Sequence, residues 1–192
     1  MKRIFDILFS LFMIIIWSPI FILIGIAIKL TSKGPAIFKQ KRVGLYEKEF
    51  YMYKFRSMIV NAENLQEYMR GLNEADGPVF KIKNDPRITF IGKFLRKTNI
   101  DEMPQFFNVL MGDMSLVGPR PPVKSEVKNY ENWHYRRLSV KPGITCTWQI
   151  QPQRHDIKFN DWVKLDLHYI DNQSFTQDII ITFKTIKMLL KN

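Results

Sequence analysis

The hydrophobic pattern divides the chain into two parts. From Ile7 to Ile28 there are 22 consecutive uncharged residues, whereas apolar and charged positions alternate over short distances after residue 32. A helix of 22 residues would extend about 33 Å, close to the thickness of a bilayer core. The pattern therefore predicts a membrane segment at residues 1–32, followed by a second part at 33–192 that folds as one unit with it.

Ser18 and Pro19 interrupt the apolar stretch. Proline removes a backbone donor and kinks a helix, and a serine hydroxyl that bonds a backbone carbonyl reinforces the bend. Lys2 and Arg3 precede the stretch, and five further basic residues follow it before the first acid, Glu47. Positive charge prefers the cytoplasmic side, so charge at both ends favours a re-entrant helix hairpin that turns at Ser18-Pro19. A plain transmembrane anchor is the alternative, because spanning helices also contain proline kinks.

The remainder of the chain predicts short strands among several helices, an α+β fold dominated by helix. Residues 36–43 and 50–56 are rich in β-formers on either side of Gly44 and predict a strand pair. Residues 115–122 read SLVGPRPP, which excludes regular helix and indicates a rigid loop. A turn and short strand are expected at 141–145. Helices are expected at 60–72, 86–96, from Asn99 or Asp101 onward, and at 123–139, 158–171 and 174–190.

The last predicted helix is amphipathic and basic. Apolar residues recur on one side of residues 174–190, with Lys184, Lys187 and Lys191 between them. Such a helix either packs on the core or lies in the headgroup layer as an interfacial helix. The pattern alone leaves both interpretations open.

The net charge and the cysteine content limit the classes of binding partner and the cellular compartment. The chain has 29 Lys and Arg against 18 Asp and Glu, a net charge of +11. This charge indicates an anionic partner: nucleic acid, a phospholipid surface or a phosphorylated substrate. Cys146 is the single cysteine, so no intrachain disulfide can form, which is compatible with a reducing cytoplasm. The three histidines lack metal-ligand spacing and are interpreted as packing or surface residues.

Residues 85–122 contain the candidate chemistry. Asp101 and Glu102 are adjacent at a predicted helix start, where the helix dipole favours negative charge and a magnesium-bound phosphate. Arg87, Arg96 and Arg120 lie nearby in sequence, and a rigid loop around Arg120 suits bidentate phosphate contact. An isolated Asp-Glu pair is more commonly a helix cap, so these residues alone do not decide the function.

This stretch resembles, almost position for position, the core signature of the bacterial sugar transferases. These are monotopic polyprenyl-phosphate phosphoglycosyl transferases, also called undecaprenyl-phosphate sugar phosphotransferases. The resemblance extends over roughly residues 2 to 190. The matching motifs are Lys2-Arg3-Ile4-Phe5-Asp6, Ser18-Pro19, Gly34-Pro35, Tyr53-Lys54-Phe55-Arg56-Ser57-Met58, Asp85-Pro86-Arg87-Ile88-Thr89, Leu95-Arg96-Lys97-Thr98, Asp101-Glu102, Pro104-Gln105, Asn108-Val109-Leu110, Gly112-Asp113-Met114-Ser115, Val117-Gly118-Pro119-Arg120-Pro121, Lys141-Pro142-Gly143-Ile144-Thr145, Leu165-Asp166, Tyr169-Ile170 and Asp178.

The resemblance implies a reaction. Family members move a sugar-1-phosphate from a UDP-sugar to undecaprenyl phosphate and release UMP, which initiates a capsule, exopolysaccharide, O-antigen or other glycan. Asp101 would be the nucleophile, forming a phosphosugar-aspartyl intermediate, and would bind Mg²⁺. Glu102 would orient the metal or assist the second attack.

The resemblance also implies binding residues and a location. Four cations match family positions that hold phosphate, nucleotide or metal-site partners, and Asp178 matches a carboxylate that contributes from the last helix. The Ser18-Pro19 match implies that residues 1–32 enter and leave the bacterial inner membrane on its cytoplasmic face, where residues 33–192 form the catalytic domain. The four cations are Lys54, Arg96, Arg120 and Arg154.

One segment departs from the family pattern. After Lys-Pro-Gly-Ile-Thr the chain reads CTWQIQPQRHD, which keeps Arg154 in register. Pro152-Gln153 replaces the usual Ser-Gly, and His155 replaces an asparagine. Since glycine tolerates backbone conformations that glutamine does not, the substrate choice and the role of Arg154 stay open. The sugar, the glycan pathway and the oligomeric state, including a homo-oligomer, are also undetermined.

Two other classes of protein account for fewer features of the sequence than a sugar transferase does. A basic nucleic-acid-binding domain accounts for the charge but not for the apolar segment or the carboxylate pair, so no nucleic-acid partner is expected. A non-catalytic membrane scaffold would have lost Asp101-Glu102 or the arginines, and the chain retains both.

Overall fold

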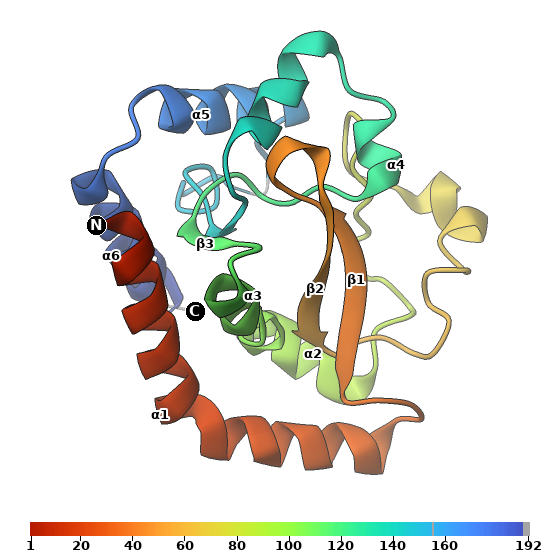
Figure 1. Cartoon of the computed structure of the whole chain (residues 1–192). Helices are drawn as coiled ribbons and strands as arrows, with labels where there is room; N and C mark the ends of the chain where they lie inside the picture. Colours follow the sequence, from red (N-terminus) through yellow and green to blue (C-terminus); the bar gives the residue numbers. More distant parts are fainter. Residues whose placement is uncertain (155, 190–192) are drawn as a thin grey trace.

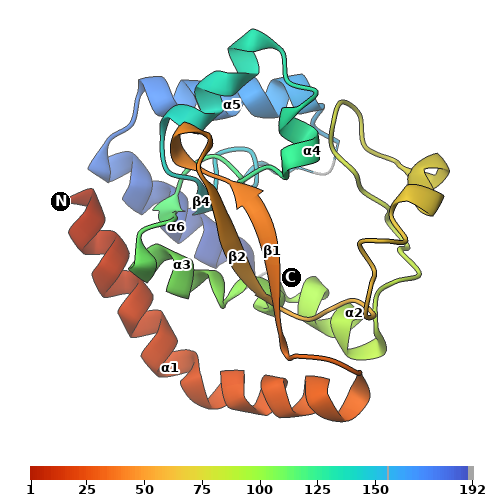
Figure 2. The same ribbon diagram turned by 45° about the vertical axis from the view of Figure 1, so that its right-hand side comes forward.

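The N-terminal helix α1, Lys2–Thr31, bends near its middle (Figure 1). The computed structural model describes residues 1–154 and 156–189. Pro19 lies inside α1, and Ser18 Oγ donates a hydrogen bond to the Ile15 carbonyl at 2.8 Å, as the sequence predicts. The outcome is one continuous bent helix, with halves that run in different directions instead of lying side by side as a tight hairpin (Figures 1 and 2). Ser18 and Pro19 keep a helical backbone conformation. The motif therefore bends the helix but does not reverse the direction of the chain.

Helix α1 is joined to the rest of the fold at both ends. Near its start, Lys2 Nζ donates to Asp178 Oδ2 at 2.9 Å, and the buried Asp6 carboxylate accepts from Ser115 Oγ at 2.8 Å. Between these ends most of the helix is exposed, and it is the one helix in the described part of the chain long and apolar enough to cross a membrane. Its second half contributes to a core cluster of Ile24, Ile28, Phe55 and Leu95.

The predicted strand pair is confirmed. Strands β1, Ile37–Val43, and β2, Glu49–Phe55, pair antiparallel around the short helix η1, Leu45–Glu47. Alternation along paired strands puts Arg42, Met52 and Lys54 on one face. Met52 on that face packs with Val109 and Met114. The hairpin therefore presents two cations toward the centre of the molecule.

Two very short strands and two long helices complete the centre. Strand β3, Ser115–Val117, pairs in parallel with β4, Gly143–Thr145. The helices predicted over 158–171 and 174–190 are α5, Phe159–Asp171, and α6, Phe175–Leu189; residue 190 lies outside the described residues. With the two small sheets, these confirm the helix-dominated α+β class.

Three other predicted helices are shorter than expected. The remaining helical segments are η2, Glu67–Leu72; α2, Phe90–Lys97; η3, Ile100–Glu102; α3, Gln105–Met111; α4, Lys124–Val127; and η4, Asn132–Ser139. The helix expected at 60–72 is wrong over its first half, where Asn61 has a left-handed φ of 63°. Residues 123–139 form two pieces because Glu131 is extended and its N–H donates to His134 Nδ1.

The helix expected at 86–96 starts four residues later than predicted. The Asp85 carboxylate accepts hydrogen bonds from the backbone and side chain of Arg87, which hold the Asp-Pro-Arg segment as a turn. Thr89 then caps α2 by accepting from the Gly92 N–H at 3.0 Å. A threonine cap satisfies one of the free donors at a helix start, so the helix begins after it.

A buried ion pair gives a test of the core. Arg137 on η4 contacts Asp166 on α5 at 2.7 Å, and both side chains are at most 4% exposed. Asp166→Ala is expected to lower the free energy of unfolding by about 3–5 kcal/mol, because it leaves a buried guanidinium unpaired. Urea unfolding in detergent micelles measures the loss. Asp161→Ala, at an exposed position on the same helix, should cost less than about 1 kcal/mol.

Candidate active site

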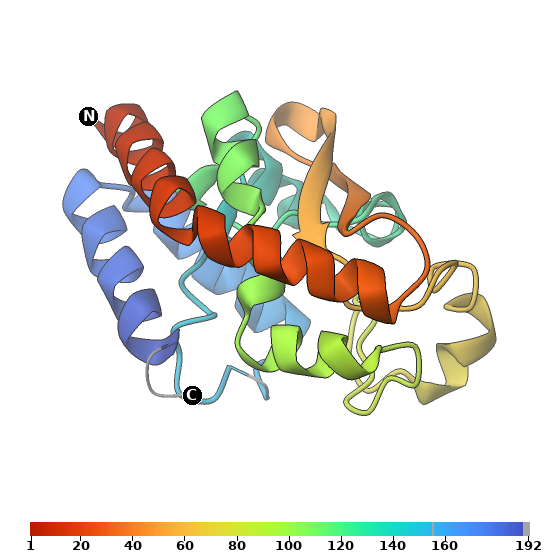
Figure 3. The ribbon, with the colours of Figure 1, turned by 90° about the horizontal axis from the view of Figure 1, so that it is seen from below.

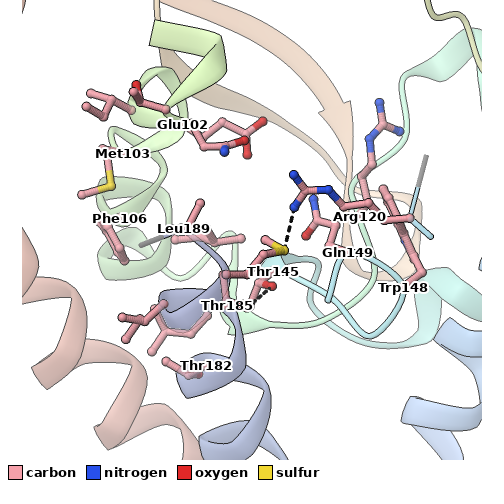
Figure 4. Close-up of a pocket in the computed structure, with 18 of the residues that line it drawn as sticks. Glu102, Met103, Phe106, Arg120, Thr145, Trp148, Gln149, Thr182, Thr185 and Leu189 are labelled. Atoms are coloured by element: carbon pink, nitrogen blue, oxygen red, sulfur yellow. Dashed lines mark hydrogen bonds between the residues drawn. The ribbon is translucent and has the colours of Figure 1, made fainter. Parts of the chain in front are cut away.

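A cavity of about 610 Å³ lies between α1, α6, the segment around η3 and the residues after β4 (Figure 4). Its volume is typical of a small-molecule site. Glu102, Arg120 and Arg154 line it, as does Gln149. The cavity therefore brings together charged groups from segments that are far apart in sequence.

The carboxylate pair lies on η3. Asn99, with a left-handed φ of 56°, starts this single turn, which carries Asp101 and Glu102. Asp101 is 6% exposed, whereas Glu102 reaches the cavity with a side chain one-third exposed. Lys54 Nζ donates to Glu102 Oε1 at 2.5 Å, so the strand pair and η3 meet through one ion pair.

The environment separates the proton affinities of the two carboxyl groups. Burial, followed by the neighbouring Glu102 charge, raises the pKa of Asp101 to about 6, against the opposing effect of Lys54 and Arg96. Burial also raises the pKa of Glu102, but the charge and hydrogen bond of Lys54, with Arg120, outweigh it and lower that pKa overall. The pair therefore contains one stabilised carboxylate and one whose charge is poorly compensated.

This difference predicts a pH-dependent stability in magnesium-free buffer. Between the unfolded pKa near 3.8 and the folded value near 6, the folded protein binds the Asp101 proton more tightly. The contribution of Asp101 to the free energy of unfolding is therefore fully present below pH 4 and lost as pH rises through 6. Asp101→Asn should avoid this loss and be more stable than wild type by about 1–3 kcal/mol at pH 7.5. Parallel urea titrations at pH 4.5 and 7.5 measure the difference, and equal stabilities at pH 7.5 would contradict it.

Neighbouring residues hold the arginines in place. Arg96 Nε donates to the buried Ser57 Oγ at 2.9 Å, and Arg120 Nη1 contacts Glu126 Oε2 at 3.4 Å. The loop after β3 is itself fixed, since Arg42 Nη1 donates to the Pro121 carbonyl at 2.9 Å. The sequence predicts a rigid loop over residues 115–122. Residues 115–117 form strand β3 instead, so the prediction holds only for the residues that follow it.

Arg154 lines the cavity and belongs to the segment after β4 that differs from the family pattern. Its Nη1 donates to Met188 Sδ on α6 at 2.6 Å, and both residues line the cavity. The adjacent position 155 lies outside the described residues. The described part of the segment thus places a cation on the cavity wall.

Asp178 is not brought to the cavity. It is 2% exposed and accepts from Tyr169 OH at 2.5 Å and from Lys2 Nζ at 2.9 Å. Its carboxylate therefore fastens α6 to α5 and to the start of α1. The geometry supports an anchoring role for this residue and gives no support to substrate contact.

Sequence reasoning missed four residues of the site. Arg42 was one, although strand alternation puts it on the same face as Lys54; burial and the Arg120 charge lower its pKa to about 10, so it stays cationic. Gln149 lines the cavity, and Ser57 and Glu126 hold arginines. No spacing in the sequence relates Ser57 or Glu126 to the arginine that each contacts.

Asp101 and Glu102 offer two adjacent carboxylates as oxygen donors. No group of three or more His, Cys, Asp and Glu able to hold a metal occurs within residues 1–154 and 156–189. Magnesium commonly uses one or two carboxylates and completes its shell with water and phosphate oxygens. The poorly compensated charge of Asp101, beside Glu102, is the kind of donor set that such a cation would stabilise.

The family model described as bacterial sugar transferase matches residues 1–192. The chain belongs to this family. The match includes both the apolar helix and the carboxylate pair, so the sugar transferase region extends over all the elements described above.

Named relatives support the assignment. The galactosyl transferase CpsE of Streptococcus agalactiae serotype III (strain NEM316) is 52% identical over 82% of this chain and 35% of its own length. The undecaprenyl-phosphate galactose phosphotransferase of Salmonella typhimurium (strain LT2) is 44% identical over all of this chain and 40% of its own length. The exopolysaccharide production protein ExoY of Sinorhizobium fredii (strain NBRC 101917 / NGR234) is 37% identical over 96% of this chain and 83% of its length. The chain thus spans about two fifths of the first two relatives and most of the third.

Proposed function

We propose that this sugar transferase moves a sugar-1-phosphate from a UDP-sugar to undecaprenyl phosphate and releases UMP. The observation that carries the proposal is the carboxylate pair on η3: Asp101 is buried with a raised pKa, and the adjacent Glu102 lines a cavity together with Arg120 and Arg154. Cations around one poorly compensated carboxylate suit attack on a phosphate, because they neutralise the repulsion between two anions. The product would initiate a surface polysaccharide or related glycan.

Asp101 is the nucleophile in the proposed reaction. A carboxylate oxygen attacks the sugar-proximal phosphorus, a new oxygen–phosphorus bond forms, and the bond to the bridging oxygen breaks so that UMP leaves with the electron pair. An oxygen of the lipid phosphate then attacks the same phosphorus, forms the diphosphate and returns the Asp101 carboxylate. Lys54, Arg96 and Arg120 neutralise phosphate charge, and Arg154 contacts the nucleotide or sugar at the cavity wall.

Magnesium is part of the proposal. Asp101, with Glu102 close by, would hold the ion, which would supply positive charge beside the diphosphate. Glu102 also orients Lys54 through their 2.5 Å hydrogen bond. Removal of magnesium by EDTA should therefore abolish UMP release and leave the fold intact.

The proposed location is the cytoplasmic face of the bacterial inner membrane. Figure 3 shows α1 lying across the molecule with α2 and α6 near it. Apolar residues are exposed along α1, and Phe90 and Phe94 on α2 are 93% and 58% exposed beside Lys93 and Lys97. An exposed apolar surface edged by lysines suits anionic headgroups. In this proposal the bend at Ser18-Pro19 lets α1 enter and leave on one face.

UMP release from purified protein tests the proposal. The protein in nanodiscs receives magnesium, undecaprenyl phosphate and one UDP-sugar at a time. UDP-galactose is tried first because two of the relatives above are named for galactose. UMP that depends on both lipid and a particular sugar supports the function and identifies the donor. A folded, membrane-bound protein that releases no UMP with any donor in a panel of hexoses and N-acetylhexosamines would contradict it.

A further inference from the structure

The cavity changes character along its length. Figure 4 shows Glu102, Arg120 and Gln149 in the upper and right-hand part of the lining, which also includes Lys81 and Arg154. The other end is lined by apolar side chains from α1, α3 and α6 and from the turn that precedes α3, and Figure 4 shows Met103 and Phe106 below Glu102 on this side. The apolar lining from these elements includes Phe9, Met13, Trp17, Met103, Phe106 and Ile186.

The contribution of α1 to this lining is a regular stripe. Phe9, Met13 and Trp17 are four residues apart, so they lie on one face of the helix. All three are half-buried, whereas Phe12 and Ile16 between them are more than half exposed. The first half of α1 therefore presents one apolar face to the cavity and another to its surroundings.

The apolar end offers few free polar groups to a ligand. Thr182 and Thr185 of α6 line it, but their hydroxyls already donate to the Asp178 and Ile181 carbonyls at 2.8 and 2.9 Å. A uracil or a sugar ring needs several hydrogen-bond partners, because burying polar groups without them is unfavourable. These contacts favour an apolar occupant that enters from the side of α1.

We propose that the apolar end binds the isoprene units of the lipid acceptor closest to its phosphate. This inference rests on the proposed function and deepens it. The acceptor phosphate would lie at the Glu102–Arg120 end, and its tail would follow the Phe9–Met13–Trp17 stripe. The continuity of the stripe with the apolar α1 gives the tail a path toward the bilayer. A polar head and an apolar tail match the two ends of the cavity.

Filling the apolar end tests this assignment. Met13→Trp places a larger side chain in the cavity, and Phe12→Trp is the matched control on the exposed face of the same helix. Acceptors with two, three and eleven isoprene units are compared at saturating donor. Met13→Trp should raise the KM for undecaprenyl phosphate at least about tenfold and weaken its dependence on chain length, whereas Phe12→Trp should change the KM less than about twofold. Equal effects of the two variants, or no effect of Met13→Trp, would overturn the proposal.

Two further readouts separate folding and function from tail binding. Stoichiometric UMP release without acceptor reports the first chemical step, and Ile186→Trp enters the same cavity from α6 if Met13→Trp fails to fold. If wild type releases no UMP at all, the proposed function fails and tail binding is tested alone with a photoreactive prenyl phosphate. Cross-links within residues 7–20 that farnesyl phosphate suppresses and phosphatidylglycerol does not would support the assignment. Equal suppression by phosphatidylglycerol, or cross-links only elsewhere, would overturn it.

Discussion

Asp101→Asn is expected to reduce UMP release by at least about a thousandfold while the protein stays folded. The amide keeps the shape of the carboxyl group but has no anionic oxygen to attack phosphorus, and loss of a covalent nucleophile commonly costs three or more orders of magnitude. Asp101 is 6% exposed and its pKa is raised to about 6. The native carboxylate is therefore unfavourable for stability, and its replacement should not unfold the chain.

Two measurements distinguish a nucleophile from a metal ligand at this position. Rapid mixing of wild type with donor and no acceptor should give one equivalent of UMP and a mass increase equal to the sugar phosphate, located on the peptide with Asp101. Asp101→Asn should show neither, and Asp161→Asn, at an exposed site on α5, should behave as wild type. Wild-type UMP release by Asp101→Asn would remove the nucleophile assignment. A mass increase on another residue would transfer the role to that residue.

The site was partly predictable from the sequence because its chemistry is concentrated in short motifs. Asp101 and Glu102 are adjacent in the chain, and the Gly-Pro-Arg-Pro-Pro run restricts the backbone around Arg120. In the structure Glu102, Arg120 and Arg154 line the same cavity. The bend of α1 was equally local, since Ser18 bonds a carbonyl only three residues away.

Other features depend on contacts between distant segments, which no local pattern contains. Nothing in the sequence around Asp178 indicates that it pairs with Lys2, which is 176 residues away. From the sequence, Arg42 resembles an ordinary surface cation of a basic strand. Only the folded structure shows that Pro121 and Arg120 lie next to it. The first half of the helix expected at 60–72 does not form. The apolar residues of this stretch have little core to pack against, since only Ala62 among residues 60–72 is buried.

Arg120→Gln is expected to lower kcat by about a hundredfold or more. Arg120 lines the cavity together with Glu102, and its guanidinium is held by Glu126 at 3.4 Å on a loop that Arg42 fixes. A preorganised donor aimed at developing negative charge commonly contributes two to three orders of magnitude to kcat. Glutamine can still donate one hydrogen bond but has no charge, so attack of one anion on another loses its compensation.

Three further variants show whether the charge of Arg120, its planar geometry or its support by Glu126 causes the effect. Arg120→Lys keeps the charge but loses the planar fork, so it should recover only part of kcat if the contact with phosphate is bidentate. Glu126→Gln leaves the guanidinium intact but weakens its support, and it should lower kcat less than Arg120→Gln does. Arg136→Gln removes an exposed arginine that pairs with Asp171 and should leave kcat unchanged. If Arg120→Gln lowers kcat no more than Arg136→Gln, Arg120 contacts no reacting phosphate. If Arg120→Lys has wild-type kcat, charge alone accounts for its action and the fixed geometry of the loop serves another purpose.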